Sequence, residues 1–443
     1  MSKTHQTADL DGDSHAEGNP QTWPISRLFD VAKCQGGSAF SPSLQGRTSG
    51  EIPFLKVSDM NSMENRWEIR VSNNYVTKKD ASRINGTAKP KGSVIFPKVG
   101  AAIHTNKKRF LGNDAYVDNN VLAAWTLNED LCTPAYLYLY FLTINLSTLS
   151  NPGPLPSINN SKVYELEIPL PPKLEQQKIA AVLWQIQRAI ATQDRLLAAT
   201  RDLKAAAMQR LFTRGLSGEA LKETEIGPMP QSWQVRRLDT CCDVVNSSLS
   251  YTDLANMGDH TGDTVSTFGI KVSDMNLPGN EQQIVHANLE RRISLPLARK
   301  KSVPANAVVF PKRGAAIATN KKRLTTKWTV LDPNLIGVHA KSGLDHLFLF
   351  YWFEQFDLRT ITDPGPTPQL NKKNLVPLLL PMPTIENEQR AIAATLATID
   401  RQLAHHRQKR AALNDLFQTS LHKLMTAQLR VGDLDIDTSE IAP

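Results

Sequence analysis

Two copies of one short basic motif carry the residue types best suited to binding chemistry in this sequence. Phe96–Arg109 reads FPKVGAAIHTNKKR and Phe310–Arg323 reads FPKRGAAIATNKKR, so 12 of 14 positions agree. Each copy ends in TNKKR, which places three cations beside a hydroxyl and an amide. Lys and Arg neutralise phosphates, while Asn and Thr can bond to phosphate oxygens or base edges. The motif therefore favours nucleic-acid contacts, and the alternative for a single copy is a solvated basic turn.

A second pair of identical blocks accompanies the basic motif. Lys56–Asn61 reads KVSDMN, and Lys271–Asn276 repeats all six residues. The two pairs together establish a tandem repeat, and their recurrence strengthens the nucleic-acid interpretation. The candidate DNA-binding residues of the first copy are Lys56, Ser58, Asp59, Asn61, Lys98, His104, Thr105, Asn106, Lys107, Lys108 and Arg109. Those of the second copy are Lys271, Ser273, Asp274, Asn276, Lys312, Arg313, Thr319, Asn320, Lys321, Lys322 and Arg323.

Differences between the two copies point to different targets. Val99 is replaced by Arg313, His104 is replaced by Ala318, and residues 67–75 have no close counterpart in the second half. Shared residues suit a shared task such as holding phosphates. Divergent residues suit the reading of different bases.

The charge distribution also favours a polyanionic partner. The 443-residue chain carries a net charge of +8, but residues 1–20 and 429–443 each contribute −3, so the body between them carries +14. A basic body attracts nucleic acid, although charge alone is equally compatible with an ordinary basic protein.

Motifs for catalysis are not found in the sequence. It contains no P-loop, no glycine-rich nucleotide loop and no Asn/Asp-Pro-Pro-aromatic motif, since DPGP at Asp363 lacks the adjacent second proline. Four cysteines without C-x-x-C spacing are typical of reduced thiols: Cys34, Cys132, Cys241 and Cys242. The sequence shows neither an apolar run long enough to span a membrane nor a secretion signal, so we expect a cytoplasmic protein without a membrane partner.

Each basic motif has the same predicted structural neighbours. β-branched and aromatic residues before it indicate a strand that runs into a proline turn and a glycine, and an apolar helix follows further on. The expected strands are Val94–Phe96 and Val308–Phe310, the glycines are Gly100 and Gly314, and the helices are residues 134–142 and 346–353. A proline-rich turn and one short strand should then lead straight into a long helix.

Two long helices are the strongest structural prediction. Pro172–Gly215 has apolar residues at heptad spacing, and Glu388–Met425 repeats its start, with EQRAIAATL from Glu388 matching EQQKIAAVL from Glu175. About 40 residues at roughly 1.5 Å each make a helix of about 60 Å. The predicted seam residues are Ile179, Leu183, Ile186, Ile190, Leu197, Ile392, Leu396, Ile399, Leu403, Leu413 and Phe417.

These observations predict an α+β chain with two globular domains in tandem repeat, each followed by a long helix. A pseudo-twofold axis relating two similar domains on one duplex would make the helices pair as an antiparallel coiled coil. The expected segments are an acidic disordered arm (1–19), a first domain (20–171), a central spacer helix (172–215), a linker (216–229), a second domain (230–383), a C-terminal spacer helix (384–427) and an acidic tail (428–443).

Over nearly its full length the chain resembles the specificity subunit of type I restriction-modification systems. The resemblance rests on the order domain, helix, domain, helix, on PQTW and PQSW at the domain entrances, on the two helix starts, and on LFTRG and LMTAQLRV at the helix ends. It implies a non-enzymatic reader of double-stranded DNA, in which each target recognition domain reads half of a bipartite asymmetric site. The family's partners would be two modification subunits that use S-adenosylmethionine to methylate adenine, and restriction subunits that use ATP and Mg. The resemblance implies no cofactor on this chain itself.

Two other classes of function stay open. A stand-alone two-domain DNA-binding or structural linker protein would need no partner, and a structural linker would show absent or salt-insensitive DNA affinity. A DNA methyltransferase in its own right would need a methyl-donor motif, and methylation by the purified chain would reveal it.

Overall fold

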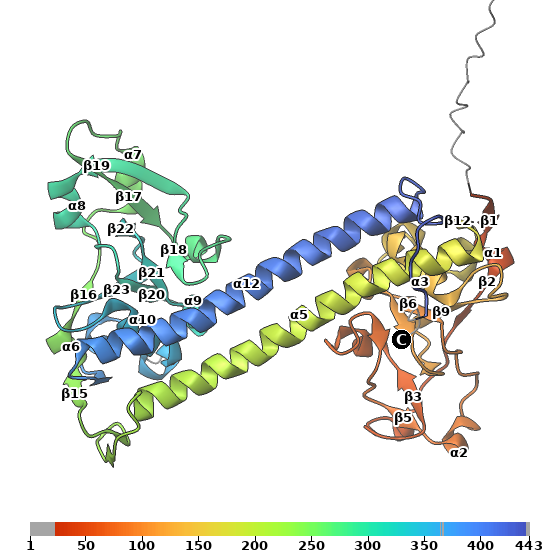
Figure 1. Cartoon of the computed structure of the whole chain (residues 1–443), viewed down its shortest axis with the longest axis horizontal. Coiled ribbons are helices and arrows are strands. Elements are labelled where there is room, and N and C mark those ends of the chain that lie inside the picture. Colours follow the sequence, from red (N-terminus) through yellow and green to blue (C-terminus); the bar gives the residue numbers. More distant parts are fainter. Residues whose placement is uncertain (1–22, 364, 366, 440–443) are drawn as a thin grey trace, which may run out of the picture. The chain divides into compact units, whose positions relative to one another are not determined.

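The computed structural model describes residues 23–363, 365 and 367–439. The predicted arm at 1–19 lies outside the described residues, as do residues 440–443 of the predicted tail. The chain divides into two compact units, one formed by the residues up to Asp194 together with those from Lys409 onward, and one formed by Arg195–Gln408. Both divisions fall inside long helices, so each unit holds one mixed domain and half of each helix (Figure 1).

A five-stranded sheet forms the centre of the first domain. Its strand order is β2 (Ala32–Gly36), β9 (Val121–Thr126), β6 (Val94–Pro97), β7 (Arg109–Leu111) and β4 (Glu68–Ile69). Within this sheet only the β4–β7 pairing is parallel. The predicted strand at Val94–Phe96 is thus confirmed as β6, and its side chains alternate between two cores.

One of these cores packs between the large sheet and a small one. The small sheet has the order β5 (Tyr75–Val76), β3 (Ile52–Leu55) and β8 (Tyr116–Val117). Ile95 of β6 joins Leu55 and Val117 of the small sheet in this core. Because strand side chains alternate, Val94 and Phe96 point to the opposite face.

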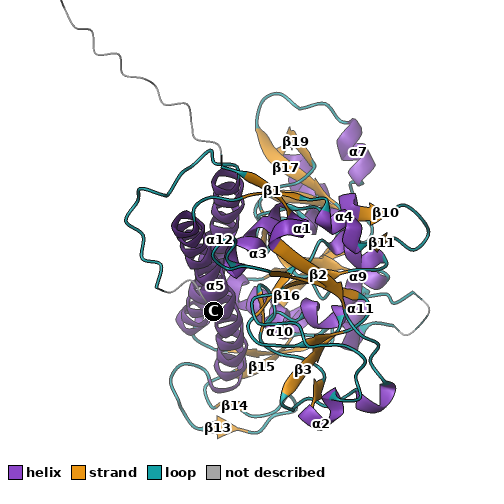
Figure 2. Cartoon of the chain, turned by 90° about the vertical axis from the view of Figure 1, so that its right-hand side faces the viewer, coloured by secondary structure: helices purple, strands orange, loops and turns teal. Residues whose placement is uncertain are grey.

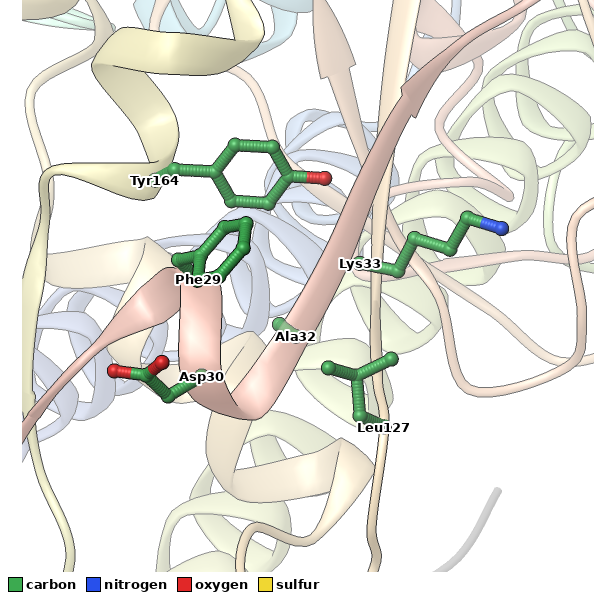
Figure 3. Close-up of a pocket in the computed structure, with 6 residues that line it drawn as sticks. All are labelled: Phe29, Asp30, Ala32, Lys33, Leu127 and Tyr164. Atoms are coloured by element: carbon green, nitrogen blue, oxygen red, sulfur yellow. The ribbon is translucent and has the colours of Figure 1, made fainter.

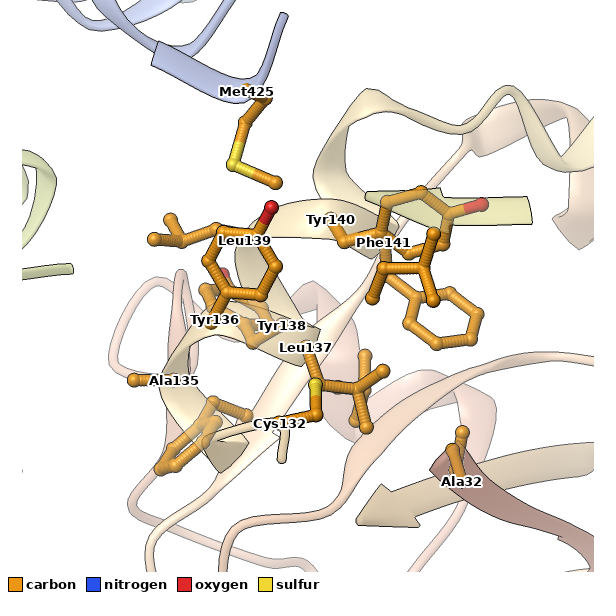
Figure 4. Close-up of a cluster of buried hydrophobic side chains, with 14 of the residues drawn as sticks. Ala32, Cys132, Ala135, Tyr136, Leu137, Tyr138, Leu139, Tyr140, Phe141 and Met425 are labelled. Carbon is orange, nitrogen blue, oxygen red and sulfur yellow. The ribbon is translucent and has the colours of Figure 1, made fainter. Parts of the chain in front are cut away.

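The opposite face is covered by α3 (Pro134–Thr143), which confirms the helix predicted at 134–142. Residues 135–141 are all buried (Figure 4), so this helix is apolar on every side. Two of its three phenols find acceptors: the hydroxyl of Tyr136 donates to the Pro169 carbonyl at 2.8 Å, and that of Tyr140 donates to the Glu167 carbonyl at 2.9 Å. These bonds join α3 to β12 (Glu167–Pro169), which pairs with β1 (Ile25–Arg27).

The second domain repeats this topology strand for strand. Its large sheet has the order β16 (Cys242–Val245), β23 (Leu335–Ala340), β20 (Val308–Pro311), β21 (Arg323–Thr325) and β18 (Gln283–Ile284). Its small sheet has the order β19 (Leu289–Ser294), β17 (Thr264–Ile270) and β22 (Trp328–Leu331). The covering helix is α10 (His346–Gln355), and β15 (Gln234–Arg237) pairs with β24 (Leu379–Met382). The strand and helix predicted in this copy are confirmed.

The two units also contain shorter helices and strands (Figure 2). They are α1 (Leu28–Val31), α2 (Lys78–Ala81), β10 (Ser150–Asn151), β11 (Ser157–Ile158), α4 (Asn160–Tyr164), β13 (Leu221–Lys222), β14 (Met229–Pro230), α6 (Leu238–Cys241), α7 (Tyr251–Asn256), α8 (Leu295–Lys301), α9 (Ala315–Ala318) and α11 (Lys372–Leu375). The predicted direct path from the proline-rich turn through one strand into each long helix is incomplete, because α4 and α11 precede those strands.

The long helices α5 (Lys173–Arg214) and α12 (Glu386–Met425) pack against each other within each unit. In the first unit, Ile179 and Leu183 share a core with Phe417 and Leu424, so the start of α5 meets the end of α12. In the second unit the end of α5 meets the start of α12. The antiparallel pairing is confirmed. The predicted seam residues are buried, apart from the half-buried Ile186, Ile399 and Leu413.

Each long helix starts at the same junction with its domain. The indole of Trp23 donates to Glu175 Oε2 at 3.3 Å, and the indole of Trp233 donates to Glu388 Oε2 at 3.2 Å. The next residue in each helix is a fully buried glutamine that bonds only to backbone. Gln176 bonds to the backbone of Leu131, Thr133 and Pro171, and Gln389 to that of Gly343, Asp345 and Pro383.

The described part of the acidic tail packs onto the first unit at this junction. Arg430 donates to both carboxylate oxygens of Glu175, at 2.7 and 2.8 Å, and Val431 is buried in the core. The ammonium of Lys178 donates to the Gly432 carbonyl at 2.7 Å. Burial by itself would raise the pKa of Glu175, but the bonds from Arg430 and Trp23 hold it below its usual value.

Candidate nucleic-acid interface

Both basic motifs form the same sharply turned loop. After β6 or β20, Gly100 and Gly314 adopt φ of 78° and 65°, which favours glycine because it lacks a Cβ. One helical turn follows, and Asn106 or Asn320 then ends it in the left-handed conformation, with φ of 53° and 52°. Asparagine tolerates this conformation better than most residues. The two loops therefore aim the following three cations in the same way.

The second cation of each motif points into the domain. Lys108 and Lys322 are 2% and 3% exposed. The Lys108 ammonium donates to the carbonyl of Ile144, the residue that caps the C-terminal end of α3, and the Lys322 ammonium donates at 2.6 Å to Phe356, which caps α10. A cation at this end also complements the helix dipole. Burial lowers the pKa of both lysines to about 8.

The third cation joins the two repeated blocks to each other. Arg109 donates to the carbonyls of Lys108 at 2.8 Å and Met60 at 2.7 Å. Arg323 makes the same bonds in the second domain, to Lys322 at 2.8 Å and Met275 at 3.2 Å. The guanidinium groups thus tie the TNKKR loop to the KVSDMN turn.

The acidic and amide members of the two blocks also bond within the fold. Asp59 accepts bonds from the Lys56 amide at 2.7 Å and from the amide and side chain of Asn73 at 2.8 and 2.9 Å. Asp274 does the same with Lys271 and Asn288. Asn106 accepts from the Leu146 amide, and Asn320 from the Leu358 amide.

These contacts give part of the predicted interface a role within the fold. The middle lysine and the arginine of each motif donate to backbone carbonyls of their own domain. The residues that hold the loops in this way are Asp59, Asn106, Lys108, Arg109, Asp274, Asn320, Lys322 and Arg323. DNA contact at these positions stays a prediction.

The other predicted residues lie at the surface around two matching pairs. The Lys107 ammonium donates to Asn61 Oδ1, and the Lys321 ammonium donates to Asn276 Oδ1, so each pair links its two loops. The ammonium nitrogen of Lys56 lies 5.4 Å from the centre of the Phe40 ring, and that of Lys271 lies 4.2 Å from the centre of the Tyr251 ring. The remaining candidates, partly or largely exposed, are Ser58, Lys98, His104, Thr105, Ser273, Lys312, Arg313 and Thr319. DNA contact at these positions stays a prediction.

The second domain carries further surface cations that the sequence reasoning missed. Helix α8 has Arg299, Lys300 and Lys301 in its last turn, and Arg292 lies on the adjacent strand β19. The run RKK in the sequence was the available signal. The corresponding short helix of the first domain, α2 after β5, carries only Lys78 and Lys79.

A hollow of about 380 Å³ in the first domain is lined by Phe29, Asp30, Ala32, Lys33, Leu127 and Tyr164 (Figure 3). The rings of Phe29 and Tyr164 meet edge to face, with centroids 5.4 Å apart. Its walls are mainly apolar, and it lies outside the loops described above. Among the described residues, no group of three or more His, Cys, Asp or Glu side chains is placed to hold a metal ion.

We expect the buried lysine of the first motif to contribute to stability, and to do so increasingly as pH rises. Because the folded pKa of Lys108 is about 8 against 10.5 for an ordinary lysine, the unfolded chain binds more protons between these values. The free-energy difference between wild type and Lys108→Met should therefore grow from pH 8 to pH 10. Denaturant titrations at pH 7, 8, 9 and 10 measure it. A difference that is constant or shrinks over this range would contradict the buried position.

Comparisons with known proteins agree with the duplicated architecture. Residues 20–199 match the family model described as the type I restriction modification DNA specificity domain. The type I restriction enzyme MjaVIII specificity subunit of Methanocaldococcus jannaschii is 21% identical over 443 residues, covering 94% of this chain and 95% of that protein. By these matches the chain is similar to type I restriction-modification specificity subunits over nearly its full length. The putative MjaX specificity subunit of the same organism is 24% identical over 279 residues, covering 62% of each protein.

Solved structures of specificity subunits share the fold. The S subunit of the type I restriction-modification system from M. genitalium has a TM-score of 0.58 at 13% identity, covering 92% of this chain and 97% of that one. A chain from a structure of type I restriction-modification complex assembly has a TM-score of 0.50 at 19% identity, covering 93% and 99%. Across the part of the chain that the structure describes, no helix is both long and apolar enough for a transmembrane span.

Proposed function

We propose that this chain is the specificity subunit of a type I restriction-modification system, a non-catalytic DNA reader in which each domain recognises one half of a bipartite asymmetric site. The observation that carries this proposal is the duplication of one surface on two domains. The Lys107–Asn61 and Lys321–Asn276 pairs sit on matching loops, while their surroundings differ in charge. Equivalent contacts suit the phosphates that every duplex offers, and divergent neighbours suit different bases.

The antiparallel helices support the same arrangement. Two similar domains that read opposite strands of one duplex are related by a pseudo-twofold axis, and that operation reverses the direction of the helix leaving each domain. The pairing of α5 with α12, start to end in each unit, has this polarity. The helices would then act as a spacer between the half-sites.

The chemistry of the system is assigned to partner subunits. The carboxylates of the shared loops, Asp59 and Asp274, each accept three hydrogen bonds within their own domain, which favours a structural over a catalytic role. Two modification subunits carrying S-adenosylmethionine would methylate adenine, and restriction subunits using ATP and Mg would translocate or cleave DNA. This chain would bind none of these cofactors.

Salt dependence of duplex binding tests the proposal. Each Lys–phosphate contact contributes roughly 0.9 to the slope of log Kobs against log salt concentration. Replacing both Lys107 and Lys321 with Ala should therefore reduce the slope by roughly two and weaken binding to all sequences alike. Lys423→Ala, an exposed lysine in the last turn of α12, is the matched charge control and should leave the slope unchanged.

Other outcomes favour the alternatives. Wild-type affinity for duplex DNA that is absent or insensitive to salt would support a structural linker. Transfer of methyl groups by the purified chain, without a modification subunit, would support a methyltransferase.

A further inference from the structure

A tryptophan flanked by two lysines lies on the large sheet of the first domain. Lys33 of β2 is directly opposite Trp125 of β9 in the strand pairing, and its ammonium nitrogen lies 5.6 Å from the centre of the indole ring. Lys89, which bridges to Ala115 just before β6, places its ammonium nitrogen at 5.6 Å from the same ring. One indole therefore brings two cations of the domain together.

The positive charge at this place is not neutralised by the protein. Lys89 is only 2% exposed, yet among the described residues neither lysine has a carboxylate within 4.0 Å or a side-chain hydrogen bond. Burial lowers the pKa of Lys89, and the nearby charge of Lys33 lowers it further. The Cys34 thiol nearby offers no negative charge, since burial raises its pKa to about 12. Cation–π contact compensates only in part for the burial of a charge that has no carboxylate partner.

Lys33 also lines one wall of the apolar hollow. Figure 3 shows its side chain extending away from the rings of Phe29 and Tyr164. Its ammonium lies beside Trp125 instead, at the distance given above.

The fold itself does not require these cations. In the second domain Val303 takes the place of Lys89, with the corresponding bridge to Thr329, and it is fully buried. His339 replaces Trp125, and opposite it Asp243 replaces Lys33 and forms an ion pair with Lys341 at 3.4 Å. The second domain thus forms the same strand pairings with Val303 in place of a lysine and with the Asp243–Lys341 ion pair. The unpaired cations belong to the first domain alone.

We propose that Lys33 and Lys89 form an oxyanion-binding site beside Trp125 that takes a phosphate group. A phosphate oxygen accepts charge-assisted hydrogen bonds from ammonium groups and supplies the missing negative charge. The phosphate can be part of a DNA backbone, in which case the inference rests on the proposed function, or it can be a free anion. If the phosphate belongs to DNA, the first domain contacts the duplex backbone at a position for which the second domain has no equivalent.

The test uses the full chain and the variant Lys33→Ala/Lys89→Val, in which the buried lysine takes the residue of the second domain. Binding of inorganic phosphate is measured by calorimetry, and duplex binding is measured over a range of salt concentrations. We expect the variant to lose phosphate binding and, if the ligand is the DNA backbone, to lower the salt slope by roughly 1.8. Lys423→Ala is again the charge control. An unchanged unfolding midpoint confirms that the variant folds.

The outcomes distinguish a DNA-backbone phosphate from a free anion, and they distinguish failure of the phosphate site from failure of the proposed function. Lost phosphate binding with an unchanged DNA slope identifies a site for free anions. No phosphate binding by the wild type, together with an unchanged slope in the variant, overturns the site. If the wild type binds no DNA at all, the proposed function fails while the phosphate measurement still decides the site.

Discussion

Lys204→Met should lower the free energy of unfolding by about 3 to 5 kcal/mol, because it would leave the buried carboxylate of Asp400 and the partly exposed carboxylate of Glu354 without a cation. The Lys204 ammonium lies 2.7 Å from both Glu354 and Asp400, and Tyr351 donates its hydroxyl to Asp400 at 2.8 Å. The side chains of Lys204 and Asp400 are only 12% and 6% exposed. Burial raises the pKa of Glu354, so the loss should shrink in acid as this carboxyl protonates. Denaturant titration at pH 7 and pH 5 measures both effects.

The first unit supplies the matched control for this cluster. In the alignment that places Glu175 opposite Glu388, Phe417 corresponds to Lys204 and Gln187 to Asp400. Phe417 is buried against Trp67, with ring centroids 5.4 Å apart. Lys204→Met combined with Asp400→Gln and Glu354→Gln removes all three charges. It should recover most of the lost stability, because a buried ion cluster replaced as a whole is often neutral. A single-variant loss below about 1 kcal/mol would show that the cluster is solvated.

Exchanging residues 24–165 for the equivalent domain of a relative should replace one half of the methylated motif and leave the other half intact. The segment contains both sheets and α3 of the first domain and ends before α5, so the helix seam is preserved. Base-resolution mapping of methylated adenines in cells that carry the hybrid and its modification partner gives the readout. The reciprocal exchange in the second domain should change only the other half.

This exchange tests whether the two domains recognise their half-sites independently. The hybrid must first be shown to be soluble and bound to its partner. If such a hybrid changed or lost both halves together, the two domains would not read independently.

Much of the architecture was accessible from sequence because it occurs twice. The strands at Val94 and Val308 and the apolar helices after them share a pattern that chance does not repeat, and heptad spacing indicated which faces of α5 and α12 are buried. Local pattern and tertiary packing agree at these elements. For such elements, prediction from sequence succeeds.

The orientation of individual cations was not accessible in the same way. KKR is typical of a surface run, and Lys108 turns inward because the open carbonyl of Ile144 at the end of α3 lies next to it in the fold. That carbonyl is 36 residues away in the chain. Likewise, the glutamine after Glu175 is an ordinary helix residue until its backbone partners from α3's N-terminal cap are in place. The spacing of residues in the sequence does not predict hydrogen bonds between segments that are far apart in the chain.

The tail that packs beside Glu175 has a consequence for synthesis on the ribosome. The second unit is one continuous stretch, Arg195–Gln408, and all of its contacts are available once that stretch has emerged. The first unit begins to emerge earlier but needs Phe417, Leu424 and Val431 to complete its core. Completion of the two units should therefore occur in the reverse of their order of translation. Until then the nascent first domain exposes the apolar face of α5, a surface that invites chaperone binding or premature association.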